Sequence, residues 1–275
     1  MHRWNEHGRV CKTVEKGEKM KHLFASDYDG TLFKNHEITE KDLTAIQTFQ
    51  SEGHKFGIVT GRSIHSIISE IDLHKIPVDF VVGVNGAVVL DKDRNELFIS
   101  KIDKDAAKEV LNYINQYDVH YYGVNDGYRH GQIKFSKDSY PFESNIVNTP
   151  IEELLEAGVS GMYVGNGTSE AAITLSKVLN DTFKEHGIKS YVNADGIDIA
   201  SSSVSKTTGI EKIKEHLSLE GSIFTVGDSY NDIPMLRDFN GYLMNNGERE
   251  LEKYARCGIV DSVADALNDV LAKIK

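Results

Sequence analysis

Cysteine and tryptophan are scarce in this chain of 275 residues, which has two cysteines, Cys11 and Cys257, and a single tryptophan, Trp4. The cysteines stand far apart and in no metal-ligand spacing, so neither a disulfide framework nor a zinc site is indicated. The longest apolar runs, such as residues 80–84 and 222–226, have the length of strands, whereas a bilayer span needs about 20 apolar residues. We therefore expect no membrane segment and a location in the reducing cytoplasm.

Basic residues are also outnumbered: 31 Lys and Arg stand against 42 Asp and Glu, for a formal net charge of -11. Proteins that bind nucleic acid need basic faces that release counterions from the phosphates, so a nucleic-acid partner is not expected. The negative net charge does not exclude small anionic substrates, because a few local donors or a metal outweigh a distant net charge. With 40% hydrophobic residues the chain is too apolar to be disordered, and its length suits one large α/β domain or two modest ones.

The first 20 residues carry charges but no apolar stretch, so they do not form a secretory signal. We expect residues 1–20 to be a mobile extension outside the core. A misplaced start is the alternative, with Met20 as the initiator.

Both ends of the chain predict one parallel sheet covered by helices. Near the amino end, strand-like runs alternate with helix-like stretches in a βαβαβ pattern. The strands are predicted over residues 23–26, 55–60 and 79–83 and the helices over 40–51 and 65–73. The alternation returns near the carboxyl end, with helices over 207–216, 233–239 and 262–274 and strands over 222–226 and 241–244.

The middle of the chain differs from both ends in its predicted pattern of strands and helices. It predicts a hairpin over residues 87–102 that turns at 91–95, a Tyr-rich strand over 120–123 and helices over 105–116 and 169–185. We therefore expect the α/β class, with a Rossmann-like parallel-sheet core of residues 21–86 and 198–275 and an inserted α+β domain of residues 87–197. A single irregular α/β domain is the alternative.

Asp27 and Asp29 follow the first predicted strand directly, in the segment Asp-Tyr-Asp-Gly-Thr that ends at Thr31. The carboxyl ends of parallel strands form the ligand crevice of an α/β sheet, so both carboxylates are expected there. Two acids held close repel each other unless a cation or a proton lies between them, and Mg²⁺ suits such a pair. Gly30 permits a tight turn. An Asp-rich turn without a ligand is the alternative.

A second acidic cluster, the segment Gly-Asp-Ser-Tyr-Asn-Asp of residues 227–232, also follows a buried strand. Asp228 and Asp232 are four residues apart around a turn, so they are expected to face the same cation from the side opposite Asp27. Ser229 and Asn231 add short donors. The alternative is an ordinary loop and helix cap, where Asp, Ser and Asn are common.

Two further segments predict contacts with an anion. Thr60 and Gly61 end a strand before a helix, and a hydroxyl, a glycine N–H and helix N-terminal amides together bind anions. Lys206 stands at the start of a helix, where a cation opposes the helix dipole unless a phosphoryl group or Asp side chains neutralise it. A routine helix cap and a solvated lysine are the respective alternatives.

Taken in order, these elements resemble the motifs of the haloacid dehalogenase-like (HAD) phosphatase superfamily. The residues that carry the resemblance are the DxDGT segment at 27–31, the Thr-Gly-Arg loop at 60–62, Lys206 and the GDxxND segment at 227–232. Asn85-Gly86-Ala87 and the long insert resemble the Cof-type branch. That branch has a large α/β cap, so the inserted α+β domain is expected to be a cap domain.

The resemblance implies roles for these residues. Asp27 would be the nucleophile that forms an aspartyl-phosphate, and Asp29 the general acid and base, with its backbone carbonyl on Mg²⁺. Phosphate oxygens would be bound by Thr60, Gly61, Lys206 and Asn231. The metal would be held by Asp27, Asp29, Asp228 and Asp232, and Asp232 would alternatively orient Lys206.

The cap would close over the leaving group and set substrate choice. The candidate specificity residues are Arg62, Tyr128, Arg129 and His130, with Asn193, Asp195 and Gly196 at the return to the core. Tyr and His in strands are alternatively packing or surface residues. The expected function is Mg²⁺-dependent hydrolysis of small phosphorylated metabolites such as sugar phosphates. A phosphomutase or phosphotransferase and a catalytically silent regulatory relative are the alternatives, and the sequence says nothing about oligomeric state.

Overall fold

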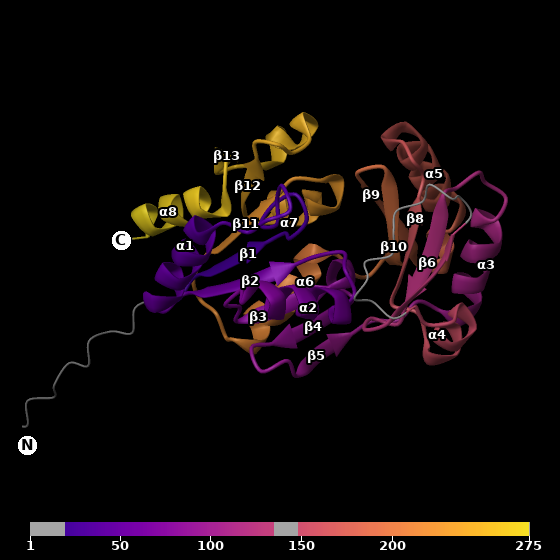
Figure 1. Ribbon diagram of the computed structural model, residues 1–275, viewed down its shortest axis with the longest axis horizontal. Coiled ribbons are helices and arrows are strands. Elements are labelled where there is room, and N and C mark those ends of the chain that lie inside the picture. Colours follow the sequence, from indigo (N-terminus) through magenta and orange to yellow (C-terminus); the bar gives the residue numbers. More distant parts are fainter. Residues whose placement is uncertain (1–19, 135–147, 275) are drawn as a thin grey trace, which may run out of the picture.

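The computed structural model describes residues 20–134 and 148–274, which form two sheets with helices packed against them (Figure 1). The predicted N-terminal extension lies outside the described residues except for Met20. Among the described helices, none combines the length and the apolar composition that a membrane crossing requires.

The larger sheet contains the strands predicted at both ends of the chain. Its strands are β1 (Leu23–Ser26), β2 (Lys55–Val59), β3 (Phe80–Gly83), β4 (Val88–Asp91), β5 (Glu96–Ile99), β11 (Ile223–Gly227), β12 (Asn240–Met244) and β13 (Gly258–Val260). Their spatial order is β13-β12-β11-β1-β2-β3-β4-β5. Pairing is parallel from β13 to β3 and antiparallel from β3 to β5. The strand order reverses beside β1, which is where α/β sheets bind ligands.

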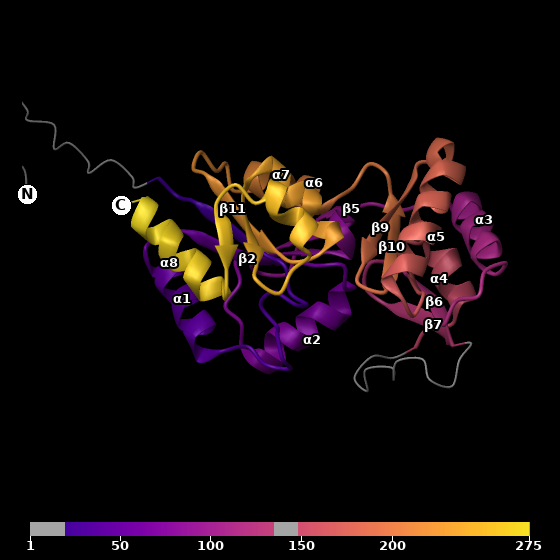
Figure 2. The same cartoon turned by 90° about the horizontal axis from the view of Figure 1, so that it is seen from above.

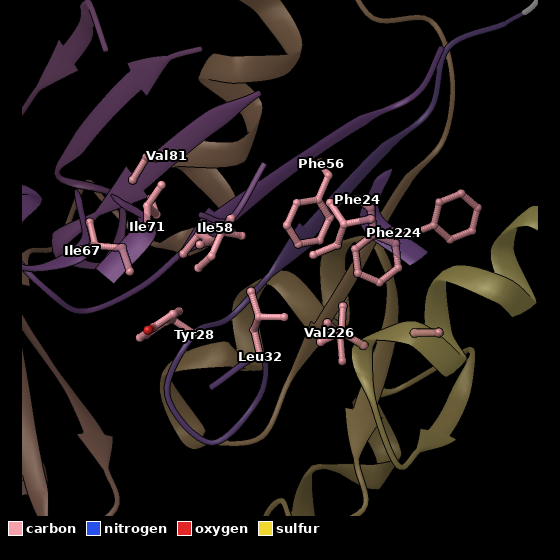
Figure 3. Packing of buried hydrophobic residues seen from close by; sticks show 14 of the residues in the cluster. Phe24, Tyr28, Leu32, Phe56, Ile58, Ile67, Ile71, Val81, Phe224 and Val226 are labelled. Atoms are coloured by element: carbon pink, nitrogen blue, oxygen red, sulfur yellow. The ribbon is translucent and has the colours of Figure 1, made fainter. Parts of the chain in front are cut away.

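Helices cover both faces of this sheet. The helices of one face are α1 (Glu40–Ser51), α2 (Ile64–His74) and α8 (Val263–Lys273), and those of the other are α6 (Lys206–His216) and α7 (Ile233–Asp238). Phe24, Phe56 and Phe224 come from the neighbouring strands β1, β2 and β11 and lie together beneath the first group (Figure 3). The short apolar strands are thus buried on both sides, which explains their continuous hydrophobic runs.

The smaller sheet belongs to the inserted domain and is antiparallel. Its strands are β6 (Tyr121–Asn125), β7 (His130–Lys134), β8 (Gly161–Gly165), β9 (Ile188–Asn193) and β10 (Gly196–Ser201), in the order β7-β6-β8-β10-β9. One face is covered by α3 (Lys104–Ile114), α4 (Ile151–Ala157) and α5 (Ser169–Thr182). These helices lie on the side away from the core, so the uncovered face of the sheet faces the core (Figures 1 and 2).

Four short 3-10 helices complete the described elements. They are η1 (Val84–Gly86), η2 (Lys184–His186), η3 (Tyr230–Asp232) and η4 (Arg249–Tyr254). Two of them lie after core strands at the edge that faces the inserted domain: η1 follows β3 directly, and η3 begins three residues after the end of β11.

The predicted Rossmann-like core and inserted α+β cap are confirmed, but strand pairing corrects both boundaries between them. The predicted cap includes the hairpin β4–β5, yet Val89 pairs with Val82 of β3, so the hairpin extends the core sheet. The predicted core includes most of strand β10, yet Ile199 pairs with Met162 of β8 in the cap sheet. The local pattern of apolar and polar residues identifies a strand, but it does not show which sheet the strand joins.

Candidate active site

The candidate site lies where four core strands end opposite the cap sheet. Asp27 follows β1, Thr60 follows β2, Asn85 lies in η1 after β3, and Asp228 follows β11. A cavity of about 400 Å³ separates these loops from the uncovered face of the cap sheet. Core residues Asp27 and Asp29, and cap residues from β6 to β10, line this cavity. The predicted motifs therefore meet at one place, between the two domains.

The centre of the site is a buried lysine held by two carboxylates. The Nζ atom of Lys206 donates to Oδ1 of Asp27 at 2.5 Å and to Oδ1 of Asp232 at 2.6 Å. The side chains of Lys206 and Asp232 are fully buried, and that of Asp27 is 8% exposed. Lys206 is the first residue of α6, so these two carboxylates supply the negative charge that a cation at a helix start requires.

Asp232 also fixes the loop that carries Asp228. Its second oxygen, Oδ2, accepts from the backbone N–H groups of Asp228 at 2.9 Å and of Ser229 at 3.0 Å. One carboxylate thus orients Lys206 with Oδ1 and closes the turn after β11 with Oδ2. Asp232 thus contacts Lys206 directly, and its part in holding a metal stays a prediction.

Asp228 completes a group of three carboxylates. One oxygen each of Asp27, Asp228 and Asp232 lie within 4.8 Å of one another. Thr31 Oγ1 donates to Oδ1 of Asp228 at 2.7 Å. Gly30 adopts φ +80°, and a Cβ atom there would lie 2.4 Å from Oδ2 of Asp228. The glycine of the DxDGT segment therefore supplies both the turn and the space that Asp228 occupies.

The electrostatics of this group favour a cation. Burial raises the pKa of Asp27 well above its ordinary value, Lys206 opposes this shift, and the carboxylates of Asp232 and Asp228 add to it. Burial and the charge of Asp232 raise the pKa of Asp228 to about 6. For Lys206, burial lowers the pKa, but the two bound carboxylates outweigh burial and hold it above its ordinary value. One ammonium cannot neutralise three carboxylates, so the oxygen-only donor set fits a hard divalent cation.

Thr60 and Gly61 form the wall of the cavity beside this cluster. Thr60 is buried, and its Oγ1 accepts from the backbone N–H of Arg62 at 3.1 Å. A Cβ atom on Gly61 would lie 2.8 Å from Oδ2 of Asp198, so the chain approaches the cap closely there. The loop lies before α2, as an anion site requires, and its binding of phosphate stays a prediction.

A network of amides centred on Asp198 joins the cap to the core. Its three asparagines are among the residues singled out from the sequence, but Asp198 is not. Oδ2 of Asp198 accepts from Nδ2 of Asn85 at 2.9 Å and of Asn193 at 3.2 Å. Asn231 donates to Oδ1 of Asn85 at 3.3 Å. Burial raises the pKa of Asp198, and the bonds from the asparagines oppose this rise. The available signal was an Asp between two buried Ile residues in the segment Gly-Ile-Asp-Ile-Ala.

The turn after β3 brings Asn85 into this network through an unusual backbone. Val84 and Asn85 both have positive φ angles, 50° and 51°, which is rare for a β-branched residue such as Val84. Gly86 has φ +104°, and a Cβ atom there would lie 2.0 Å from the carbonyl oxygen of Ser205. The Asn-Gly-Ala segment thus turns Asn85 toward the cavity and lets η1 pack against the start of α6.

Asp29 is held apart from the three-carboxylate cluster. Its Oδ2 accepts from Nε of Arg62 at 2.8 Å, and its Oδ1 accepts from Nη2 of Arg62 at 2.7 Å. The side chain of Asp29 is 50% exposed and that of Arg62 is 17% exposed, and both residues line the cavity. The side chain of Asp29 therefore faces Arg62, which leaves its predicted contact with a metal to its backbone carbonyl.

The remaining specificity candidates separate into two groups. His130 lines the cavity, as do Asn193, Asp195 and Gly196, and burial lowers the pKa of His130. Tyr128 instead donates its hydroxyl to Glu96 at 2.6 Å, and Arg129 forms ion pairs with Asp126 and Glu153. Neither Tyr128 nor Arg129 is among the described residues that line the cavity, so their predicted contact with substrate finds no support in their positions.

Comparison with known proteins gives one family. The sequence model of the haloacid dehalogenase-like hydrolases matches residues 24–271. The chain is 24% identical over 265 residues to Phosphatase YwpJ of Bacillus subtilis, a match that covers 85% of this chain and 92% of that protein.

Solved structures show the same fold. The HAD subclass IIB sugar phosphatase BT4131 has a TM-score of 0.77 at 20% identity, with 93% of this chain and 100% of that chain covered. TM0651 from Thermotoga maritima has a TM-score of 0.71 at 23% identity, with 91% of this chain and 97% of that chain covered.

Proposed function

Because the chain belongs to the haloacid dehalogenase-like hydrolase family, we propose that it is a Mg²⁺-dependent phosphatase of small phosphorylated metabolites. The observation that carries this proposal is the buried group of Asp27, Lys206, Asp228 and Asp232, of which Asp27 lines the cavity. The name of the B. subtilis relative supports the reaction class. We place the reaction in the cytoplasm, in keeping with two widely spaced cysteines.

Mg²⁺ is the cofactor that fits the acidic cluster. Asp27, Asp228 and the backbone carbonyl of Asp29 would hold the ion. Asp232 would add negative charge beside the ion and would orient Lys206. When bound, the ion would neutralise the repulsion between the carboxylates and the negative charge of a phosphoryl group.

Asp27 is the proposed nucleophile. Its carboxylate oxygen forms a bond to phosphorus while the bond from phosphorus to the leaving oxygen breaks, and Asp29 gives that oxygen a proton. In the second step Asp29 takes a proton from water, the water oxygen bonds to phosphorus, and the bond to Asp27 breaks to release phosphate. Lys206 and the loop of Thr60 and Gly61 stabilise the phosphoryl oxygens in both steps.

The leaving group is proposed to be an uncharged, hydroxyl-bearing molecule of sugar size. The cap wall of the cavity offers neutral donors and acceptors and two acids, namely Tyr121, Asn125, His130, Gln132, Tyr163, Asn193, Asp195 and Asp198. Among the described cap residues that line it, none is Lys or Arg. A phosphomutase that works on bisphosphates must bind a second phosphoryl group there, so this wall favours water over a sugar phosphate as the acceptor. The sugar phosphatase activity named for BT4131 agrees with this choice.

The proposal is tested by measuring phosphate release from a panel of phosphate monoesters with and without Mg²⁺. We expect turnover of one or more sugar monophosphates that requires Mg²⁺ and is lost in Asp27→Asn, a variant with nearly the same size. Hydrolysis that survives this substitution would refute the assignment of Asp27. A panel without any turnover would indicate a catalytically silent relative.

A further inference from the structure

The proposed reaction leaves the role of Arg62 open, because this residue contacts Asp29 rather than standing free in the cavity. We propose that Arg62 is a positioning residue, which holds the carboxylate of Asp29 in the orientation from which it exchanges a proton with the leaving oxygen. This inference rests on the proposed function, since it assigns Asp29 as the acid and base.

The geometry of the pair is the first argument. Arg62 uses two different nitrogens, Nε and Nη2, at 2.8 and 2.7 Å from the two oxygens of Asp29. Two parallel bonds fix both the position and the rotation of a carboxylate, which a single-point contact from lysine does not. An exposed ion pair contributes little to stability, so the value of this pair lies in orientation.

The packing of the guanidinium is the second argument. Its carbon lies 5.1 Å from the ring centroid of Tyr28, a side chain that is fully buried. Nη1 donates to Ser66 Oγ at 3.3 Å and lies 3.5 Å from Oε1 of Glu70, whose Oε2 accepts from the hydroxyl of Tyr28 at 2.8 Å. These contacts therefore hold Arg62 against α2 and against the turn that follows β1.

The sequence explains why this support is available. Tyr28 stands between the two aspartates of the DxDGT segment, and Ser66 and Glu70 lie one turn apart on α2. A side chain that binds substrate directly is expected to direct its donors into the cavity. The side-chain hydrogen bonds described for Arg62 at the cavity wall go to Asp29 and to α2, which supports its role in the orientation of Asp29.

Substrates whose leaving groups differ in acidity distinguish a role in orienting Asp29 from a role in binding the phosphoryl group. A poor leaving group such as phenolate needs a proton in the transition state, whereas dinitrophenolate leaves with little help. If Arg62 orients the proton donor, its loss must slow poor leaving groups more than good ones. If it binds the phosphoryl group, its loss slows all substrates alike.

The experiment measures kcat/KM for substituted phenyl phosphates, from 2,4-dinitrophenyl to phenyl phosphate, with wild type, Arg62→Ala and Arg62→Lys. In both variants we expect kcat/KM for phenyl phosphate to fall about tenfold or more beyond any fall for the dinitrophenyl ester. Asp29→Asn should show the same preference for the better leaving group. Glu70→Gln should show a smaller defect of the same kind. Arg94→Ala is the matched control, because Arg94 pairs with Asp72 on the surface. Equal losses on all esters, or full recovery in Arg62→Lys, would overturn the proposal.

Crystal structures of wild type and Arg62→Ala provide a readout that is independent of turnover. We expect the Asp29 carboxylate to leave its wild-type position in the variant while Asp27, Lys206 and Asp232 stay in place. An unmoved Asp29 would contradict the positioning role. A wild type without phosphatase activity whose Asp29 still moves would refute the proposed function and leave the role of Arg62 in orientation supported.

Discussion

Lys206 at the start of α6 and Asp232 after β11 form a 2.6 Å ion pair in which both side chains are fully buried. They are 26 residues apart in the sequence, and each also contacts another part of the site. Asp27 shares the same ammonium, so one lysine balances part of the charge of two carboxylates. A buried pair of this kind is costly to break, because the remaining partner is left charged without water.

Lys206→Met is predicted to destabilise the metal-free protein and to abolish turnover. It leaves Asp27 and Asp232 buried without their cation, which costs about 3 to 5 kcal/mol in comparable sites. Urea denaturation in the presence of a chelator measures this loss. Lys41→Met serves as the control, because Lys41 pairs with Asp265 on the surface and its loss should change the midpoint little. Equal effects of the two substitutions would contradict the structural role of Lys206.

Gly30→Ala is predicted to weaken Mg²⁺ binding about tenfold or more, because the new Cβ would lie 2.4 Å from Oδ2 of Asp228. Gly53→Ala is a matched control: Gly53 has φ +90°, close to the +80° of Gly30, but no atom lies within 4 Å of its added Cβ. Both substitutions carry a similar backbone cost. Isothermal titration with Mg²⁺ should therefore distinguish them, and equal affinities would show that Asp228 is not a metal ligand.

Mg²⁺ binding is predicted to weaken below about pH 6. Burial, aided by the charge of Asp232, raises the pKa of Asp228 from 3.8 to about 6 in the metal-free protein. Since Mg²⁺ must displace this proton, its apparent Kd should rise about tenfold per pH unit below that value. A Kd that does not change between about pH 5 and pH 8 would contradict this assignment.

The same shift sets the pH dependence of stability in the metal-free protein. A carboxyl group whose pKa is raised by folding stabilises the folded state fully below its unfolded value of 3.8. That contribution is lost as the pH rises through the folded value of about 6. Thermal unfolding with a chelator should therefore show falling stability over this window, and added Mg²⁺ should raise the Tm more at pH 8 than at pH 5. A Tm that rises from pH 4 to pH 6 without metal would contradict the shift.

Sugar monophosphates are predicted to be turned over with a kcat/KM about tenfold or more above that of the corresponding bisphosphates. The described cap residues at the cavity offer no Lys or Arg for a second phosphoryl group, and Asp195 and Asp198 would repel one. A kinetic comparison of hexose monophosphates with hexose bisphosphates measures the ratio. Preference for the bisphosphate, with isomerised monophosphate as product, would indicate a phosphomutase.

The core could be predicted from the sequence because its signals are local. The predicted helix over residues 40–51 matches α1, and Thr39 caps it through the backbone N–H of Asp42. Strands β7 to β10 were not predicted, because each mixes buried apolar side chains with polar ones that line the cavity. Asp126-Gly127 and Asp195-Gly196 are turn signals for the hairpins β6–β7 and β9–β10, but β8 pairs with β6 and β10, which lie far from it in the sequence.

The acidic centre could be predicted because each aspartate follows its own strand. Parallel strands end at one edge, so Asp27 and Asp228 meet although 201 positions separate them. Asp198 could not be found in this way, because it reaches the site from a strand of the other sheet. The contact of Arg62 with Asp29 also depends on side-chain rotamers, which sequence spacing does not reveal.

Every step of the proposed reaction requires that Asp27 receives the phosphoryl group. The most direct measurement is to quench the enzyme during turnover with Mg²⁺ and substrate, reduce acyl phosphates with borohydride, and locate the modified residue by peptide mass spectrometry. We expect conversion of Asp27 to homoserine in wild type and no conversion in Asp27→Asn. Modification of Asp29 or Asp228 instead, or steady turnover with Asp27 unmodified, would contradict it.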